Sequence, residues 1–257
     1  TIISLAPGGQ AEAQAHHYLA QTLYRDGDWR QAVAEFAKAA EMNPSDVDAV
    51  LAGALVNAQK LGMPKEAQLG LTILLGRADD QALDARQRAE AAVRAAKFYW
   101  AVGKLSEAEK MLDAAVNLMP SEAGYRVQTG DFYRRRGRDA QSQALAEKAY
   151  IEAVKADPAS VAAQLALGGF YRETGRPDRA VEVFQNTVAN APAPLAYQYL
   201  IESLIDKGDL AAVPAQIEKL RRVRNSESIA DYLDGRLALA ESKGAGEKVQ
   251  KAAEAFR

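Results

Sequence analysis

The two histidines of this 257-residue sequence, His16 and His17, are the side chains best suited to metal or acid–base chemistry. A zinc site on a helix needs two histidines one turn apart, with a glutamate between them to act as a base. Adjacent residues of a helix point about 100° apart, so this pair cannot easily hold one metal ion. We expect His16 to pack in the interior and His17 to face an open groove.

Other catalytic patterns are also missing from the sequence. A Ser-His-Asp triad would need one of these histidines, and no G-x-S-x-G elbow accompanies them. The segment GAGEK, residues 244–248, has two glycines and a lysine but not the spacing of a phosphate-binding loop. The chain has no cysteine, which excludes disulfides, thiolate ligands and cysteine nucleophiles. The sequence therefore predicts a protein that is not an enzyme and that holds no cofactor and no metal.

The densest basic run is YRRRGR, residues 133–138. It could pair with an acidic partner or a phosphate, but we favour a solvated helix end whose cations complement the helix dipole. The net charge of −2 gives no general attraction to nucleic acid or to an anionic membrane. No run of about 18 apolar residues could span a bilayer. We expect neither nucleic-acid binding nor direct membrane insertion.

The elements that would position any site are helices, because good helix formers dominate and strand-like alternation is missing. Glycines that suit helix-ending turns recur at Gly27, Gly62, Gly103, Gly137, Gly175 and Gly208. Three prolines each follow one of these glycines by 17 residues: Pro44, Pro120 and Pro192. Two landmarks that recur at one offset predict a repeated helix–turn–helix unit.

This pattern resembles the tetratricopeptide repeat, a helix–turn–helix unit of 34 residues. The resemblance implies small residues where paired helices meet and large ones, such as Phe36 and Phe184, between neighbouring units. The small residues fall in the first helix at Ala20, Ala96, Gly130 and Gly168, and in the second at Ala32, Ala67, Ala108 and Ala180. One segment departs from the pattern, since Gly137 and Pro158 are 21 residues apart, which predicts a longer turn or a longer second helix.

The resemblance implies an all-α fold, a right-handed α-solenoid with about six repeats and a partial seventh. We expect one continuous domain over residues 1–257, because no Ser/Gly/Pro-rich linker interrupts the series. The expected repeats cover approximately residues 13–46, 48–81, 89–122, 123–160, 161–193, 194–227 and 228–257.

In this family the first helices line a concave groove that binds peptides or proteins. Carried over to this chain, the resemblance places in that groove His17, Gln21, Tyr24, Gln59, Arg94, Lys97, Trp100, Asp131, Arg134, Arg135, Arg172, Gln198 and Glu202. Tyr24 and Trp100 are the expected anchors, because aromatic residues carry much of the energy of interfaces. Chaperone-binding members grip a carboxylate with lysine and asparagine where this chain has His17 and Gln21, so a chaperone cofactor is not expected.

The predicted function is a non-enzymatic scaffold that binds a protein or peptide in this groove. Two alternatives are a regulatory or substrate-recruiting segment of a larger enzyme, and a structural solenoid that forms oligomers through its ends. The segment YLDGRLALA, residues 232–240, is similar to repeats of bacterial envelope proteins of exopolysaccharide assembly and secretion. This resemblance implies a periplasm or cell envelope, with the cytoplasm as the alternative. The abrupt start, TIISLAPGGQ, and the end within the helical VQKAAEAFR predict a piece of a longer protein.

Overall fold

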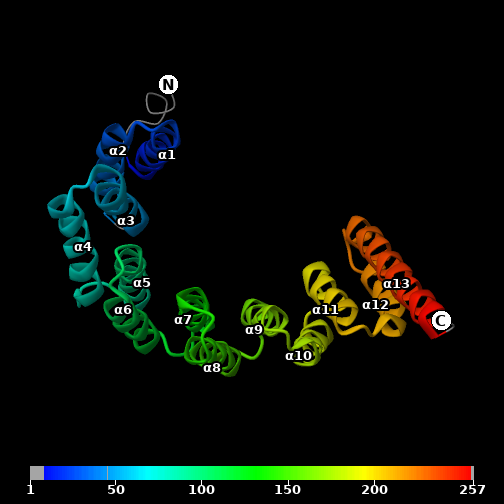
Figure 1. Cartoon of the computed structure of the whole chain (residues 1–257). Coiled ribbons are helices and arrows are strands. Elements are labelled where there is room, and N and C mark those ends of the chain that lie inside the picture. The colour runs from blue at the N-terminus through cyan, green and yellow to red at the C-terminus, as the bar shows by residue number, and fades with distance from the viewer. Residues whose placement is uncertain (1–8, 45, 256–257) are drawn as a thin grey trace. The chain divides into compact units, whose positions relative to one another are not determined.

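The structure is a computed structural model that describes the backbone of residues 9–44 and 46–255 and the side chains up to Lys243. All regular elements within these residues are helical, as predicted (Figure 1). By its contacts the chain divides into two compact units, residues 1–129 and 130–257. That the repeats form one continuous domain stays a prediction. The expectation of a longer protein rested on the two end segments, of which residues 1–8 and 256–257 lie outside the described residues.

Helical hairpins follow one another along the first unit. Consecutive helices pack in chain order, α1 on α2, α2 on α3, α3 on α4 and α5 on α6, and α5 also contacts α3 and α4. Each hairpin therefore buries its apolar side against the next one, which is how a repeat array gains stability. The elements are α1 (Gln10–Asp26), α2 (Trp29–Met42), α3 (Val47–Val56), the π-helical turn η2 (Asn57–Leu61), α4 (Pro64–Asp79), α5 (Ala85–Ala101), α6 (Leu105–Leu118) and the first part of α7 (Ala123–Arg136).

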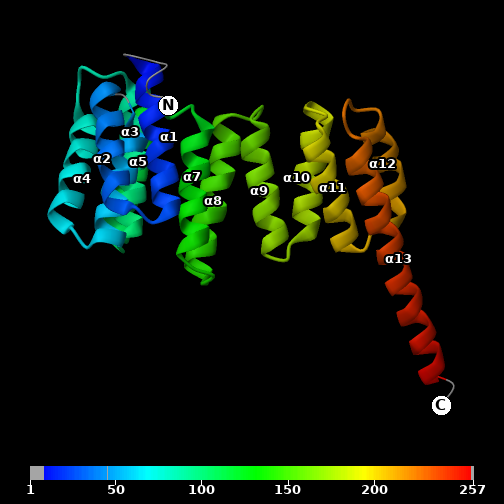
Figure 2. The ribbon, with the colours of Figure 1, turned by 90° about the horizontal axis from the view of Figure 1, so that it is seen from above.

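The second unit has the same hairpin order and ends in a long helix. It contains the end of α7 and then α8 (Ala140–Ala156), α9 (Val161–Glu173), α10 (Pro177–Asn190), α11 (Pro194–Lys207), the short η3 (Leu210–Ala212), α12 (Val213–Arg221) and α13 (Glu227–Ala255). Helix α13 packs on α11 and α12 and then runs beyond them (Figure 2). Helix α8 has 17 residues where α10 has 14, so three of the four extra residues between Gly137 and Pro158 lengthen the second helix and one lengthens the turn before it.

The predicted turn glycines end the first helices in the left-handed region. Gly27 has φ 88° and ψ 2°, and the N–H of Asp28 donates to the carbonyl of Leu23 at 2.9 Å. This is a helix C-cap that a residue with a Cβ adopts only with strain. Gly137 differs, because its φ is not positive and the next helix starts instead from Asp139, whose carboxylate accepts from the N–H of Ser142 at 2.8 Å.

Small residues allow the paired helices to approach closely, as predicted. A Cβ built on Gly168 would lie 2.4 Å from the ring of Phe184, and one on Gly130 would lie 2.6 Å from the ring of Tyr150. The alanines predicted for the second helices are buried: Ala32, Ala67, Ala108 and Ala180. Among the described residues, no helix combines the length and the apolar character that a membrane span requires.

Candidate functional site

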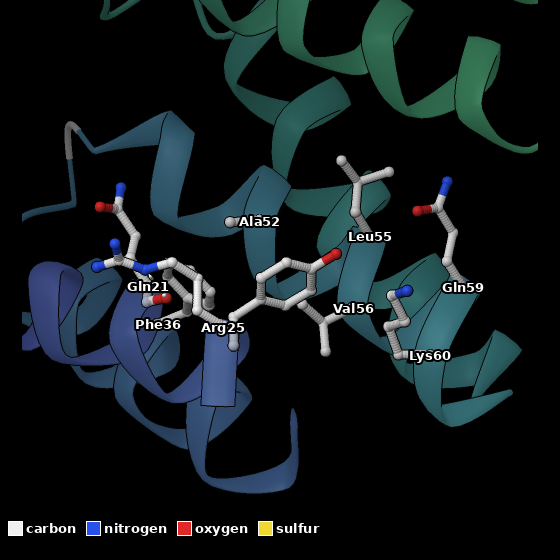
Figure 3. Close-up of a pocket in the computed structure, with 9 residues that line it drawn as sticks. Gln21, Arg25, Phe36, Ala52, Leu55, Val56, Gln59 and Lys60 are labelled. Carbon is white, nitrogen blue, oxygen red and sulfur yellow. Dashed lines mark hydrogen bonds between the residues drawn. The ribbon is translucent and has the colours of Figure 1, made fainter. Parts of the chain in front are cut away.

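A pocket of about 520 Å³ lies in the first unit between α1, α2, α3 and η2 (Figure 3). Its volume is in the range of pockets that bind small molecules or single side chains of a partner. The lining is formed by Gln21, Tyr24, Arg25, Phe36, Ala52, Leu55, Val56, Gln59 and Lys60. Three of these residues, Gln21, Tyr24 and Gln59, were predicted for the groove, and the pocket brings them together.

The pocket combines an apolar floor with a cationic rim. Phe36 and Val56 are buried and Leu55 is half-buried, so the floor consists of hydrocarbon. Arg25 and Lys60 are exposed at the rim, and no carboxylate is among the lining residues. An apolar side chain beside a carboxylate would satisfy both features. What the lining residues offer a ligand is apolar contact and positive charge.

Aromatic rings hold Lys60 at the edge of the pocket. Its Nζ lies 5.9 Å from the ring centre of Tyr24 and 5.6 Å from that of Trp29, distances typical of cation–π contacts. Both rings are more than one-third exposed. Tyr24 therefore contributes a wall of the pocket and also orients the cation beside it.

Both histidines bind carboxylates of neighbouring helices. His16 is buried, as predicted, and its Nδ1 contacts Glu35 on α2. His17, which was expected to face the groove, is half-buried; its Nδ1 lies 3.0 Å from Asp46 and its ring packs edge-on against Phe36. Among the described residues, no group of three His, Asp or Glu side chains is arranged to hold a metal ion.

The remaining predicted groove residues of the first unit lie on α5. Arg94 is half-buried and donates to Asp48 on α3 from two nitrogens, at 2.8 and 2.9 Å. These hydrogen bonds hold the pKa of Asp48 below its ordinary value. They also engage the guanidinium group of Arg94 in a contact between α5 and α3. Lys97 is exposed and Trp100 is half-buried, and neither lines the pocket at α1.

In the second unit most of the predicted groove residues form hydrogen bonds with other residues of the fold. Arg134 on α7 donates to both oxygens of Glu173 on α9, at 2.7 and 2.8 Å. Asp131 accepts from the hydroxyl of the buried Tyr150 at 2.7 Å. Arg135 is exposed at the end of the same helix. That these residues share a groove stays a prediction, and most of their polar groups are already paired.

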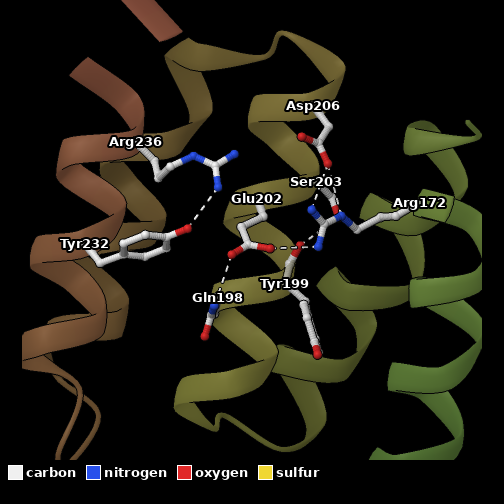
Figure 4. A network of polar contacts seen from close by, with 8 residues as sticks. All are labelled: Arg172, Gln198, Tyr199, Glu202, Ser203, Asp206, Tyr232 and Arg236. Atoms are coloured by element: carbon white, nitrogen blue, oxygen red, sulfur yellow. Dashed lines mark hydrogen bonds and ion pairs between the residues drawn. The ribbon is translucent and has the colours of Figure 1, made fainter. Parts of the chain in front are cut away.

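A polar network joins α9 to α11 (Figure 4). Arg172 donates to Glu202 at 2.8 Å and to Asp206 at 2.9 Å. Glu202 is 8% exposed and also accepts from the amide of Gln198 at 3.0 Å. A carboxylate at this burial needs such partners, so Gln198 and Glu202 serve the packing of the helices.

One rule links these contacts. The residue three positions before the turn glycine of one repeat contacts the residue two positions before the turn glycine of the next. The pairs are Arg134 with Glu173, Arg172 with Asp206, Tyr24 with Lys60, and the amide of Gln59 with the carbonyl of Ala101 at 3.5 Å. Whether such a contact between two repeats is an ion pair, a cation–π contact or a hydrogen bond thus depends on two residues at fixed positions relative to the turn glycines.

The sequence predicted only part of the pocket lining. Arg25 and Lys60 both lie two residues before a turn glycine, and neither was predicted for the groove. The signal was present, because a basic residue recurs at that position in consecutive repeats. The apolar floor at Leu55 had no such signal, since half-buried leucines occur throughout a repeat array.

Comparison with known proteins agrees with the helical hairpins. Residues 13–46 and 144–194 each match a profile described as a tetratricopeptide repeat. No curated protein sequence matches the chain significantly.

Solved structures similar to this chain include several repeat proteins. Yeast Tom70 is 15% identical with a TM-score of 0.52, over 82% of this chain and 43% of its own. The C-terminal part of a TPR repeat-containing protein from Cytophaga hutchinsonii is 14% identical with a TM-score of 0.50, over 89% and 80%. Pseudomonas aeruginosa pilF is 18% identical with a TM-score of 0.45, over 88% and 99%. At such identities the likeness concerns the fold alone.

Proposed function

Since this chain is a tetratricopeptide repeat protein, we propose that it is a non-enzymatic scaffold that captures a protein or peptide partner in the pocket between α1 and η2. Proteins of this family bind protein partners. The observation that carries the proposal is the pocket itself, which has a hydrocarbon floor and two exposed cations at its rim. A partner segment with an apolar side chain next to a glutamate or aspartate would bury the first in the floor and pair the second with Arg25 or Lys60.

Typical contact energies favour the apolar floor of the pocket as the main source of affinity for the partner. Burial of one large apolar side chain contributes about 1.5–3 kcal/mol. An exposed ion pair with Lys60 or Arg25 contributes about 0.2–1 kcal/mol. The cations therefore select and orient the partner, whereas the floor around Phe36 and Leu55 holds it.

A random peptide library displayed on phage tests the proposal with the whole chain as bait. We expect selected peptides to carry an apolar residue beside an acidic one, and Tyr24→Ala to weaken their binding about tenfold. Leu69→Ala is the matched control, because Leu69 lies in the same unit, is 64% exposed and does not line the pocket. Selected peptides that bind equally to the native chain and to Tyr24→Ala would refute the pocket as the site.

For the cellular setting we propose exopolysaccharide assembly or secretion in a bacterial envelope. The support is the similarity of residues 232–240 to repeats of such envelope proteins. Deletion of the gene from its source organism should then lower the amount of exported polymer without lowering growth. Unchanged export would contradict this setting and would leave the peptide-binding proposal intact.

A further inference from the structure

The second unit has a pocket of its own, of about 440 Å³. It lies where α7 and α9 end and where the turn leads into α8. Three of its lining residues are Arg134, Arg135 and Arg138, all from the basic run for which we expected a solvated helix end. The run is therefore gathered around a concavity, which the solvated-end interpretation does not explain.

The charge of this pocket is not balanced. Its one carboxylate is Glu173, which already receives two hydrogen bonds from Arg134 at 2.7 and 2.8 Å. Arg135 and Arg138 are exposed, and no hydrogen bond or ion pair engages their side chains within the described residues. Two guanidinium charges at the pocket are thus left without a partner.

Several other arginines of the same unit have a carboxylate partner. Carboxylates pair with Arg172, Arg176, Arg179 and Arg221. The C-terminal dipoles of α7 and α9 supply only about half a negative charge each, which is less than the two free guanidinium charges together. The pocket therefore keeps a net positive character.

The remaining lining gives the pocket a fixed shape. The ring of Phe170 is 2% exposed and forms an apolar wall. The amide of Gln143 donates to the carbonyl of Arg138 at 2.9 Å, and the hydroxyl of Thr174 donates to the carbonyl of Phe170 at 2.8 Å. These bonds hold the backbone on both sides, so a ligand meets a largely preformed site.

We propose that this pocket is a second binding site, for an acidic peptide segment in which two neighbouring glutamate or aspartate residues pair with Arg135 and Arg138. The planar fork of a guanidinium matches a carboxylate through two parallel hydrogen bonds. A volume of about 440 Å³ accommodates a few side chains of a peptide. The site is separate from the apolar pocket of the first unit and differs from it in that its affinity comes from charge.

Fluorescence anisotropy tests the proposal with a fluorescein-labelled octapeptide that contains four consecutive glutamates. The whole chain should bind it at about 50 mM NaCl and release it as salt increases, because exposed charges are screened. The double variant Arg135→Gln/Arg138→Gln should bind about tenfold more weakly. Arg222→Gln/Arg224→Gln is the matched control, since both residues are exposed, lie in the same unit and line no part of this pocket. Its affinity should stay within about twofold of the native value.

Several outcomes would overturn the proposal. The native chain could fail to bind the glutamate peptide, or it could bind a glutamine octapeptide equally well. The control variant could lose as much affinity as the double variant. A single-stranded oligonucleotide of equal charge could bind more tightly than the peptide. Circular dichroism and the urea midpoint of each variant show whether weaker binding comes from a folding defect or from loss of the binding site. Tyr24→Ala should bind the acidic peptide normally, so failure here and failure of the first pocket are distinguishable.

Discussion

Arg172 on α9 donates to one oxygen of Asp206 on α11 from Nε at 3.1 Å and from a terminal nitrogen at 2.9 Å. Arg172 stands three residues before Gly175, and Asp206 stands two residues before Gly208. Arg134 and Glu173 occupy the same two positions one repeat earlier. The ion pair is thus a feature of the repeat, and it ties the first helix of one hairpin to the first helix of the next.

Burial decides how much such a pair stabilises the second unit. Arg172 also binds Glu202, whose side chain is 11% exposed, whereas Arg86 and Glu122 in the first unit form a pair with side chains 60% and 40% exposed. We expect a double-mutant cycle with Arg172→Ala and Glu202→Ala to give a coupling energy of about 1–2 kcal/mol. The same cycle at Arg86 and Glu122 should give less than about 0.5 kcal/mol. Urea denaturation provides both values, and similar couplings would show that burial is not the deciding factor.

The pair of Asp48 and Arg94 predicts a pH dependence of stability. Hydrogen bonds from Arg94 are the main cause that lowers the pKa of Asp48 below its ordinary value of 3.8. A carboxyl group with a lower pKa in the folded state stabilises the fold above the unfolded pKa, and this contribution disappears as pH falls through the folded pKa. Asp48→Asn should therefore cost about 0.5 kcal/mol near neutral pH, because the pair is partly exposed, and almost nothing well below pH 3.8.

Urea titrations of native chain and Asp48→Asn across this range measure the difference. Asp26→Asn is the control, since Asp26 is exposed at the end of α1 and makes no ion pair within the described residues. A cost for Asp48→Asn that is the same at acidic and neutral pH would show that its charge does not contribute.

Tyr150 predicts the opposite dependence at alkaline pH. Its hydroxyl donates to Asp131 at 2.7 Å, and burial is the main cause that raises its pKa above the ordinary value of 10.0. Tyr150→Phe should cost about 1 kcal/mol near neutral pH, because Asp131 loses a donor. Above pH 10.0 the unfolded native chain releases the proton and the folded one does not, so the native advantage should shrink by up to about 1.4 kcal/mol per pH unit.

The measurement is the difference in unfolding free energy between native chain and Tyr150→Phe from pH 8 to pH 11. Tyr18→Phe serves as the control, because Tyr18 is 64% exposed, and it should follow the native chain throughout. If the difference for Tyr150→Phe did not change with pH, the buried hydroxyl would not be held neutral by the fold.

The sequence was sufficient for the hairpins because their causes are local. A glycine that ends a helix and a proline 17 residues later act on their own backbone, so Gly27 and Pro44 locate a turn and a helix end without knowledge of the rest. The exception at Gly137 also has a local cause, since Asp139 caps the following helix. The division into two units depends on contacts between distant residues, and no landmark in the sequence marks it.

The sequence could not show which polar residues of the predicted groove are already paired, because several of them have partners 30 or more positions away. Arg94 was expected to meet a ligand, yet its partner Asp48 lies 46 residues earlier in the chain. The position of Arg94, Arg134 and Arg172 within their repeats predicted that they lie on first helices. It could not show which of these charges is neutralised by a residue of a neighbouring repeat. Arg172 is paired because the next repeat has an aspartate, Asp206, within reach of it. Within the described residues no ion pair engages Arg135.

The adjacent glycines Gly168 and Gly169 on α9 provide the sharpest test of the packing. A Cβ on Gly168 would lie 2.4 Å from the ring of the fully buried Phe184, whereas one on Gly169 would meet nothing within 4 Å. Gly168→Ala should lower the free energy of unfolding by about 1–3 kcal/mol, because the ring must move within a close-packed interior. Gly169→Ala should raise it by about 0.5–1 kcal/mol, because alanine is the better helix former. Urea denaturation of both variants decides the matter, since equal shifts would mean that α9 and α10 do not approach as closely as the structure shows.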